Sequence, residues 1–172
     1  MPTALRWIAY PLLFLAGLAL IGIALLAIIV VLAYPQLPSL EVLTDYQPKI
    51  PLRIYTADGH LIGEFGEERR AFVRIQDVPP IMKQAILAAE DERFYQHPGV
   101  DTIGVLRAAY ANFTSGGKRQ GASTITMQVA RNFFLSSEKT LSRKVYEALL
   151  AFKIENNLSK DEILEIYINQ IY

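Results

Sequence analysis

The chain has 172 residues, with 17 Lys and Arg against 17 Asp and Glu, so its formal net charge is zero and nothing in it indicates a nucleic-acid partner. It contains no cysteine, which excludes a disulfide scaffold and a cysteine-ligated metal site. The hydrophobic share of 52% exceeds that of an ordinary globular domain, and the excess lies at the N-terminus.

Residues 7–34 contain no charged side chain and are long enough to cross a membrane, for which about 20 apolar residues suffice. A cleaved signal peptide would have an apolar region of only about 7–15 residues. We therefore predict a transmembrane anchor over 7–34, after a cytoplasmic tail over 1–6. Arg6 precedes the span and no basic residue follows it before Lys49, so the rest of the chain is predicted to lie outside.

The next two segments are predicted to be a linker and a small β element. Residues 35–51 contain four prolines and are predicted to be an extended linker. The β-rich runs 52–56 and 61–65 flank an Asp-Gly turn, a pattern typical of a β-hairpin. Residues 70–75 are a candidate third strand, which places the β element over 52–75.

From residue 76 onward the pattern is mainly α-helical. A first helix is predicted from the Pro79-Pro80 pair to Glu90, and four more follow, ending near residues 113, 133, 156 and 170. The predicted N-caps of these four are Asp101, Ser123, either Ser137 or Thr140, and Ser159, which forms a capping box with Glu162. Because the chain stops at Tyr172 within a helical pattern, we expect it to be the N-terminal piece of a longer protein.

The acidic run Glu90-Asp91-Glu92 ends the first of these helices, where carboxylates oppose the helix dipole. A charge placed against the preference of the helix dipole, without an evident compensation, tends to mark a functional site. Glu90 continues the apolar face from Ile86, so we expect its carboxylate to point into a cleft, where burial would raise its pKa and suit it to act as a general base. The alternative is a solvated acidic turn. His97 is either an acid/base group or a residue that orders the turn at Pro98.

A second polar run, Gly121-Ala122-Ser123-Thr124, opens the third helix with hydroxyl groups and unpaired backbone N–H groups. Such a helix start favours an anion, and nearby Lys118, Arg119 and Arg131 strengthen the prediction. The alternative is an ordinary serine cap. Further on, Arg143 and Glu147 stand four residues apart with Lys144 beside them, which on its own indicates only an intrahelical ion pair.

In order and spacing, four blocks resemble the peptidoglycan glycosyltransferase domain of class A penicillin-binding proteins. The matching residues are Glu90, Asp91, Phe94, His97 and Gly99 in the first block, Gly121, Ser123, Thr124, Ile125, Thr126 and Gln128 in the second, Arg143, Lys144 and Glu147 in the third, and Lys160, Ile163, Leu164, Tyr167 and Asn169 in the fourth.

The resemblance implies a fold and a reaction. The fold is a mainly α, lysozyme-like glycosyltransferase domain, of which residues 76–172 would be the N-terminal part, without the rest of that domain or the transpeptidase domain. The implied reaction polymerises lipid II into glycan strands, with Glu90 as general base and inversion at the donor's anomeric carbon. The implied location is the bacterial inner membrane, single-pass, with the catalytic part on the periplasmic side. The implied partners are lipid II, the nascent glycan strand, the bilayer and other cell-wall synthesis proteins.

The resemblance also implies the site residues. Glu147 is the second catalytic glutamate, with three roles left open: orienting the basic side chains, supporting the donor or holding a divalent metal. The predicted substrate-binding residues are Asp91, Phe94, His97, Ser123, Thr124, Gln128, Arg131, Arg143 and Lys144. No cofactor is required, and Mg²⁺ or Mn²⁺ at the donor pyrophosphate is left open.

Two other functions compete with the glycosyltransferase. One is a lysozyme-like hydrolase of finished glycan, which would need a carboxylic acid beside the leaving oxygen and no pyrophosphate site. The other is a non-catalytic, membrane-anchored module that only binds a partner in the cell-wall machinery.

Overall fold

The computed structural model describes residues 3–44, 51–66, 72–117, 121–135 and 140–171. The chain divides into two compact units, residues 1–37 and 38–172, with the break inside the predicted linker. The predicted domain boundaries themselves stay predictions, and the two units are described separately.

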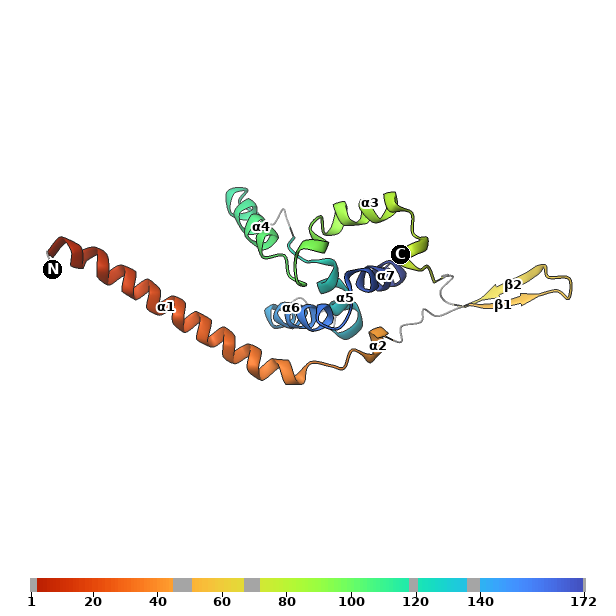
Figure 1. Cartoon of the computed structure of the whole chain (residues 1–172), viewed down its shortest axis with the longest axis horizontal. Helices are drawn as coiled ribbons and strands as arrows, with labels where there is room; N and C mark the ends of the chain where they lie inside the picture. Colours follow the sequence, from red (N-terminus) through yellow and green to blue (C-terminus); the bar gives the residue numbers. More distant parts are fainter. Residues whose placement is uncertain (1–2, 45–50, 67–71, 118–120, 136–139, 172) are drawn as a thin grey trace. The chain divides into compact units, whose positions relative to one another are not determined.

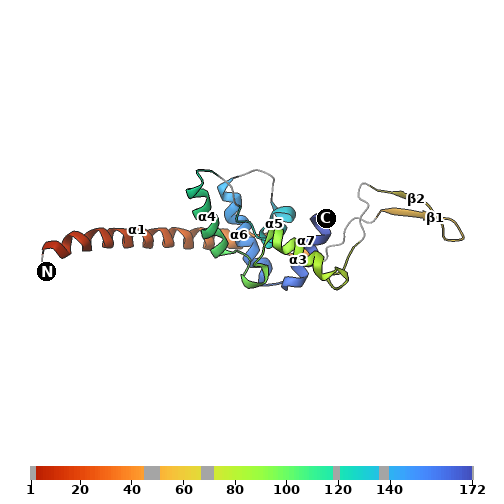
Figure 2. The same cartoon turned by 90° about the horizontal axis from the view of Figure 1, so that it is seen from above.

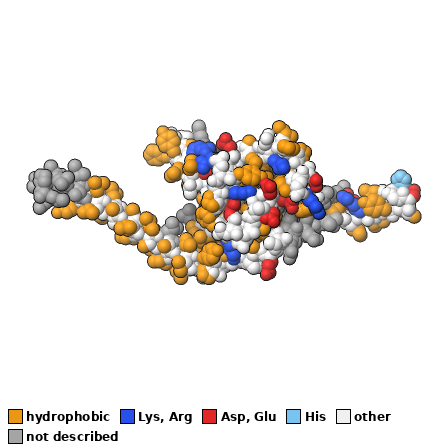
Figure 3. Space-filling model, viewed as in Figure 1, with side chains coloured by type: hydrophobic (Ala, Val, Ile, Leu, Met, Phe, Trp, Pro, Cys, Tyr) orange, Lys and Arg blue, Asp and Glu red, His pale blue; other side chains and the backbone are white. Residues whose placement is uncertain are grey.

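The first unit is a single long helix, α1 (Thr3–Ala33), followed by the short 3-10 helix η1 (Tyr34–Gln36). Residues 10–36 are apolar and long enough to cross a membrane by length and composition, and the helix surface is exposed. Figure 3 shows hydrophobic side chains along the surface of α1. The helical, fully apolar segment predicted over 7–34 is therefore present.

The second unit begins with a segment that is less extended than predicted. A short helix, α2 (Glu41–Thr44), interrupts the predicted linker, and its Leu43 is 2% exposed. The Lys153 side chain donates a hydrogen bond of 2.8 Å to the Pro38 carbonyl. The extended conformation predicted for 35–51 is therefore wrong at η1 and α2, and residues 45–50 lie outside the described part of the chain.

The predicted hairpin is confirmed. Strands β1 (Leu52–Tyr55) and β2 (Leu61–Phe65) pair in antiparallel register, with Arg53 opposite Glu64 and an irregularity between Ile54 and Tyr55. The turn depends on Gly59, whose φ of +85° favours glycine.

The candidate third strand over 70–75 is not formed in its described part. Residues 72–74 are irregular, and a 3-10 helix, η2 (Ile75–Asp77), begins at Ile75. The backbone here bonds to side chains of α7 (Lys160–Ile171) instead of to a strand. The Asn169 amide binds both the N–H and the carbonyl of Val73, and the Glu165 carboxylate accepts the Ile75 N–H.

The helices of the second unit agree with two of the four predicted caps. The remaining elements are α3 (Pro80–Glu90), the 3-10 helix η3 (Phe94–Gln96), α4 (Thr102–Thr114), α5 (Ile125–Phe134) and α6 (Leu141–Glu155). Thr140 rather than Ser137 caps α6, and the Ser159–Glu162 capping box at the start of α7 is confirmed. Ser137 lies outside the described residues.

Two caps differ from the prediction. Thr124, not Ser123, caps α5, because the Thr124 hydroxyl accepts the Met127 N–H. Asp101 stands at the predicted N-cap of α4, but its side chain makes no capping hydrogen bond. Its carboxylate is instead 3.6 Å from the Arg93 guanidinium.

The core of the second unit lies where α5, α6 and α7 pack together (Figures 1 and 2). Fully burying one aliphatic side chain contributes about 1.5–3 kcal/mol to the stability of the fold. The packing of the three helices therefore holds the residues at their ends in place. The side chains at this contact, each at most 1% exposed, are Val129, Ala130, Leu150, Ala151, Ile154, Ile163, Leu164 and Tyr167.

Candidate active site

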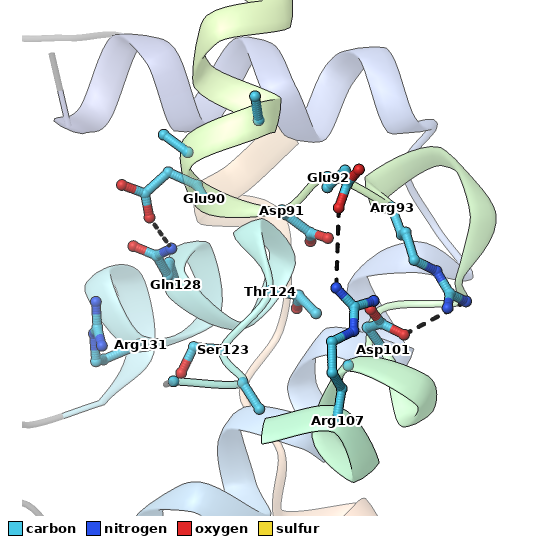
Figure 4. A pocket seen from close by; sticks show the side chains of 15 residues that line it. Glu90, Asp91, Glu92, Arg93, Asp101, Arg107, Ser123, Thr124, Gln128 and Arg131 are labelled. Atoms are coloured by element: carbon cyan, nitrogen blue, oxygen red, sulfur yellow. Dashed lines mark hydrogen bonds and ion pairs between the residues drawn. The ribbon is translucent and has the colours of Figure 1, made fainter. Parts of the chain in front are cut away.

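A cleft of about 520 Å³ lies between the C-terminal end of α3, the start of α4 and the segment that opens α5 (Figure 4). Six of the predicted site residues line it: Glu90, Asp91, Ser123, Thr124, Gln128 and Arg131. Two segments that are about 30 residues apart in the sequence therefore meet in one cavity, as the first two blocks predicted.

Glu90 ends α3 and its side chain lines the cleft, but it is exposed rather than buried. The Gln128 side-chain amide donates a hydrogen bond of 2.9 Å to a Glu90 carboxylate oxygen. The expected direction of the side chain is thus confirmed and the expected burial is wrong. Of the residues of α3 only Ile86 is buried, so the last turn of the helix is exposed to solvent.

The buried carboxylate of the acidic run is Asp91, whose residue is 7% exposed. Its oxygens lie 3.0 and 3.1 Å from the His97 Nε2, and one of them accepts the Ile125 backbone N–H at 3.1 Å. A negative charge is favourable at the start of a helix, so Asp91 complements the dipole of α5. Asp91 therefore joins the end of α3 to the start of α5.

His97 continues this buried network. The Gly99 N–H donates to the His97 Nδ1, so Nε2 carries the ring proton and donates it to Asp91. The Thr124 hydroxyl donates to the Gly99 carbonyl and accepts the Met127 N–H. His97 does not line the cleft, and of its two predicted roles the contacts support the ordering of the turn.

These contacts use two of the backbone donors at the predicted anion site at the start of α5, and the site itself stays a prediction. The Ile125 N–H is bonded to Asp91 and the Met127 N–H to Thr124, and the Thr124 hydroxyl has both a donor and an acceptor partner. The Ile125 and Met127 N–H groups are therefore already bonded within the protein.

The Ser123 hydroxyl begins a second chain of contacts, which leads to the third block. The Lys144 ammonium donates both to the Ser123 hydroxyl and to a Glu147 carboxylate oxygen, the latter at 2.9 Å. The Arg143 guanidinium is 3.5 Å from the other carboxylate oxygen of Glu147. Glu147 is only 1% exposed, so of its three predicted roles these contacts favour orienting the basic side chains.

The remaining predicted site residue, Phe94, is fully buried. Its ring packs edge-on against Tyr95 and His97, and the Lys160 ammonium is 4.3 Å from its centroid. Five of the predicted site residues do not line the cleft: Phe94, His97, Arg143, Lys144 and Glu147. Of these, Lys144 contacts Ser123, and Ser123 lines the cleft.

Sequence reasoning assigned no site role to the charged residues of the turn after α3 and of α4, which line the other half of the cleft. Arg93 is 3.6 Å from Asp101, and Arg107 is 3.9 Å from Glu92 (Figure 4). The available signal was that Arg93 and Glu92 sit inside the first block. Arg107 could be found only once α4 was known to lie along the cleft.

The arrangement does not fit a metal ion held by the protein. Within the described part of the chain, no group of three or more His, Asp or Glu side chains is placed to hold one. Glu147 is paired with Lys144 and Arg143, which compete with any cation. The prediction of Mg²⁺ or Mn²⁺ at a donor pyrophosphate stays a prediction.

Comparison with known proteins agrees with the geometry. A family model described as transglycosylase matches residues 58–172. Penicillin-binding protein 1A of Neisseria cinerea is 60% identical over 156 residues, which is 91% of this chain and 20% of that protein. Penicillin-binding protein 1A of Escherichia coli strain K12 is 55% identical over 138 residues, which is 80% of this chain and 16% of that protein.

The chain thus spans about a fifth of the length of these curated relatives. The family model nevertheless covers well over half of the chain, in the region that carries the four blocks and the cleft. The resemblance to class A penicillin-binding proteins is confirmed, and the chain belongs to the transglycosylase family.

Proposed function

We propose that the protein is a peptidoglycan glycosyltransferase, which polymerises lipid II into glycan strands at the outer face of the bacterial inner membrane. The observation that carries the proposal is the placement of the Glu90 carboxylate in a cleft whose other wall bears Ser123 and Arg131, with Lys144 bonded to Ser123. An acceptor hydroxyl needs a base, and a leaving pyrophosphate needs cations.

In the proposed reaction, a hydroxyl oxygen of the acceptor sugar attacks the anomeric carbon of the donor. Glu90 takes the hydroxyl proton as the new C–O bond forms. The bond from the anomeric carbon to the pyrophosphate oxygen breaks, and the leaving group takes the electron pair. Attack from the face opposite the leaving group inverts the anomeric centre. The leaving pyrophosphate needs its charge neutralised rather than protonated, which suits Arg131 and Lys144.

The supporting side chains have distinct roles in this proposal. Gln128 holds the Glu90 carboxylate through its amide hydrogen bond. Glu147 orients Lys144 and Arg143 from a buried position.

The apolar helix α1 supports a location of the enzyme at the membrane. Both substrate and product are attached to a lipid in the bilayer, so an anchored enzyme meets them at a raised effective concentration. The helix spans about 46 Å at 1.5 Å per residue, more than the hydrocarbon core of about 30 Å. The penicillin-sensitive transpeptidase domain and the protein partners in cell-wall synthesis that the resemblance implies belong to the proposal for the intact protein.

The test is polymerisation of labelled lipid II by the intact protein in detergent, followed by separation of the glycan strands. Replacing Glu90 by Gln keeps the shape and removes the base, so we expect the rate to fall by a factor of about 10²–10⁴ while lipid II still binds. Glu41→Gln on α2 is the matched control and should polymerise like the unmodified protein.

Three results would count against the proposal. Unchanged turnover by Glu90→Gln would remove Glu90 from the role of base. If the folded, unmodified protein does not polymerise lipid II, the binding-module function takes its place. Release of soluble fragments from purified cell wall would instead favour the hydrolase.

A further inference from the structure

Lys160, the first residue of α7, contacts the first block outside the cleft. Its ammonium donates to the His97 main-chain carbonyl and to the Glu155 carboxylate, both at 2.7 Å. It also lies 4.3 Å from the centroid of the buried Phe94 ring. The Lys160 side chain is 20% exposed and does not line the cleft.

The position of Lys160 breaks a local rule. A cation at the start of a helix opposes the dipole, and the next two residues of α7, Asp161 and Glu162, are the acidic type expected there. Glu155, at the end of α6, offsets the unfavourable charge with an ion pair whose carboxylate side chain is only 9% exposed. A local rule broken with a specific compensation indicates a role for the residue that breaks it.

Glu155 extends the contact to the second block. The carboxylate oxygen that binds Lys160 also accepts a hydrogen bond from the Thr126 hydroxyl, and Thr126 is fully buried on α5. Lys160 and Glu155 together therefore connect the segment that carries Phe94 and His97 to α5.

From His97 the network leads to the proposed base. The His97 ring donates to Asp91, the residue directly after Glu90, and Asp91 accepts the Ile125 N–H at the start of α5. One turn further along α5, Gln128 donates to Glu90. The distance between the Glu90 carboxylate and Gln128 thus depends on how residues 91–99 are held against α5.

We infer that Lys160 is a positioning residue for the glycosyl transfer: it holds the segment 91–99 against α5 and α6 and thereby sets the geometry of Glu90 and Gln128. This inference rests on the proposed function. Misplacing a reacting group by about 1 Å can cost about 100-fold in rate, so a residue outside the cleft can control turnover.

The test compares Lys160→Met, Lys160→Arg and Lys83→Met in the intact protein. Methionine keeps most of the apolar part of the side chain and removes its charge and hydrogen-bond donors, whereas arginine keeps the charge and the donors. Lys83 is the matched control, because its ammonium donates to a backbone carbonyl, that of Ile75, away from residues 91–99. The readouts are kcat and KM for lipid II polymerisation, the thermal midpoint, and hydrogen exchange of the amides in 91–99.

We expect Lys160→Met to lower kcat by about 10- to 100-fold with KM within about twofold, at a temperature where the protein remains folded. Relative to the unmodified protein, hydrogen exchange in this variant should become faster for the amides of 91–99 than for those of the core helices. Lys160→Arg should recover most of the rate, and Lys83→Met should match the unmodified protein in both kcat and exchange in this segment.

The outcomes separate this inference from the proposed function. Lys160→Met with a lowered thermal midpoint but unchanged kcat and unchanged exchange in 91–99 would overturn the positioning role and leave only a contribution to stability. If the unmodified protein does not polymerise lipid II, the proposed function fails, and exchange in 91–99 then decides alone whether Lys160 holds this segment.

Discussion

The Gln128 side-chain amide donates a hydrogen bond of 2.9 Å to the Glu90 carboxylate, across residues that are 38 apart in the sequence. This contact joins the last residue of α3 to the second turn of α5 and lies inside the cleft. A carboxylate at an exposed helix end has several rotamers, and the amide selects the one that points at the opposite wall.

Replacing Gln128 by Ala should therefore slow polymerisation without unfolding the protein. A hydrogen bond to a charged group contributes about 1.5–3 kcal/mol, so kcat should fall by about 10- to 100-fold. Gln84→Ala, at an exposed position of α3, is the control for the loss of a glutamine. Steady-state kinetics on lipid II with both variants checks the prediction, and equal rates for the two would show that the amide does not orient the base.

Replacing Asp91 by Asn should destabilise the fold. The two carboxylate oxygens accept bonds from the His97 Nε2 and the Ile125 N–H, and an amide offers one acceptor and turns an N–H towards the other donor. A buried donor left without a partner costs about 1–3 kcal/mol. Urea unfolding of the 172-residue chain in detergent would measure the loss. The exposed Asp77→Asn should change little, and an equally small effect at Asp91 would contradict the network.

The sequence predicted the helices because caps and apolar spacing are local signals. Thr140 and the Ser159–Glu162 pair fix two helix starts through residues three apart, and the structure shows the same bonds. Thr124 was missed as a cap because Ser123 is an equally good cap by residue type. The choice between them depends on Asp91 and Gly99, which are distant in the sequence.

The residues of the candidate site were predictable only in part, and the contact that each of them makes was not predictable from the sequence. Motif spacing placed Glu90 and the Ser123 block together, but it could not show that Asp91 occupies the start of α5. Asn169 is a sharper example: within its own helix it is only part of an amphipathic pattern. Its contact with Val73, 96 residues away, exists only in the folded chain.

Replacing Gly99 by Ala should cost more than the same change at Gly59. Both have positive φ, +100° and +85°, and an L-residue there costs about 1–2 kcal/mol. A Cβ on Gly59 would meet nothing within 4 Å, whereas one on Gly99 would lie 2.9 Å from the Ala151 carbonyl oxygen of α6. Urea unfolding of both variants measures the difference in the free energy of unfolding. Equal losses of stability would show that the first block does not pack closely against α6.

The Tyr95 hydroxyl donates a hydrogen bond of 2.8 Å to Asp161, next to Lys160. Partial burial and then this carboxylate raise the pKa of Tyr95 from 10.0 to about 12. Between these two pH values the unfolded chain has lost the phenolic proton and the folded chain retains it. The contribution of Tyr95 to stability is thus fully present below pH 10 and is lost as the pH rises through about 12.

Absorbance titration of the phenolates should show the corresponding change in single variants. Tyr95→Phe should remove one tyrosine that titrates near pH 12, and Asp161→Asn should lower the pKa of Tyr95 because it removes the negative charge. The pKa should stay above 10 in Asp161→Asn, since burial is the larger cause and remains. A Tyr95 that titrates at its ordinary value in the folded, unmodified chain would show that η3 does not lie against the start of α7, where Lys160 also binds the first block.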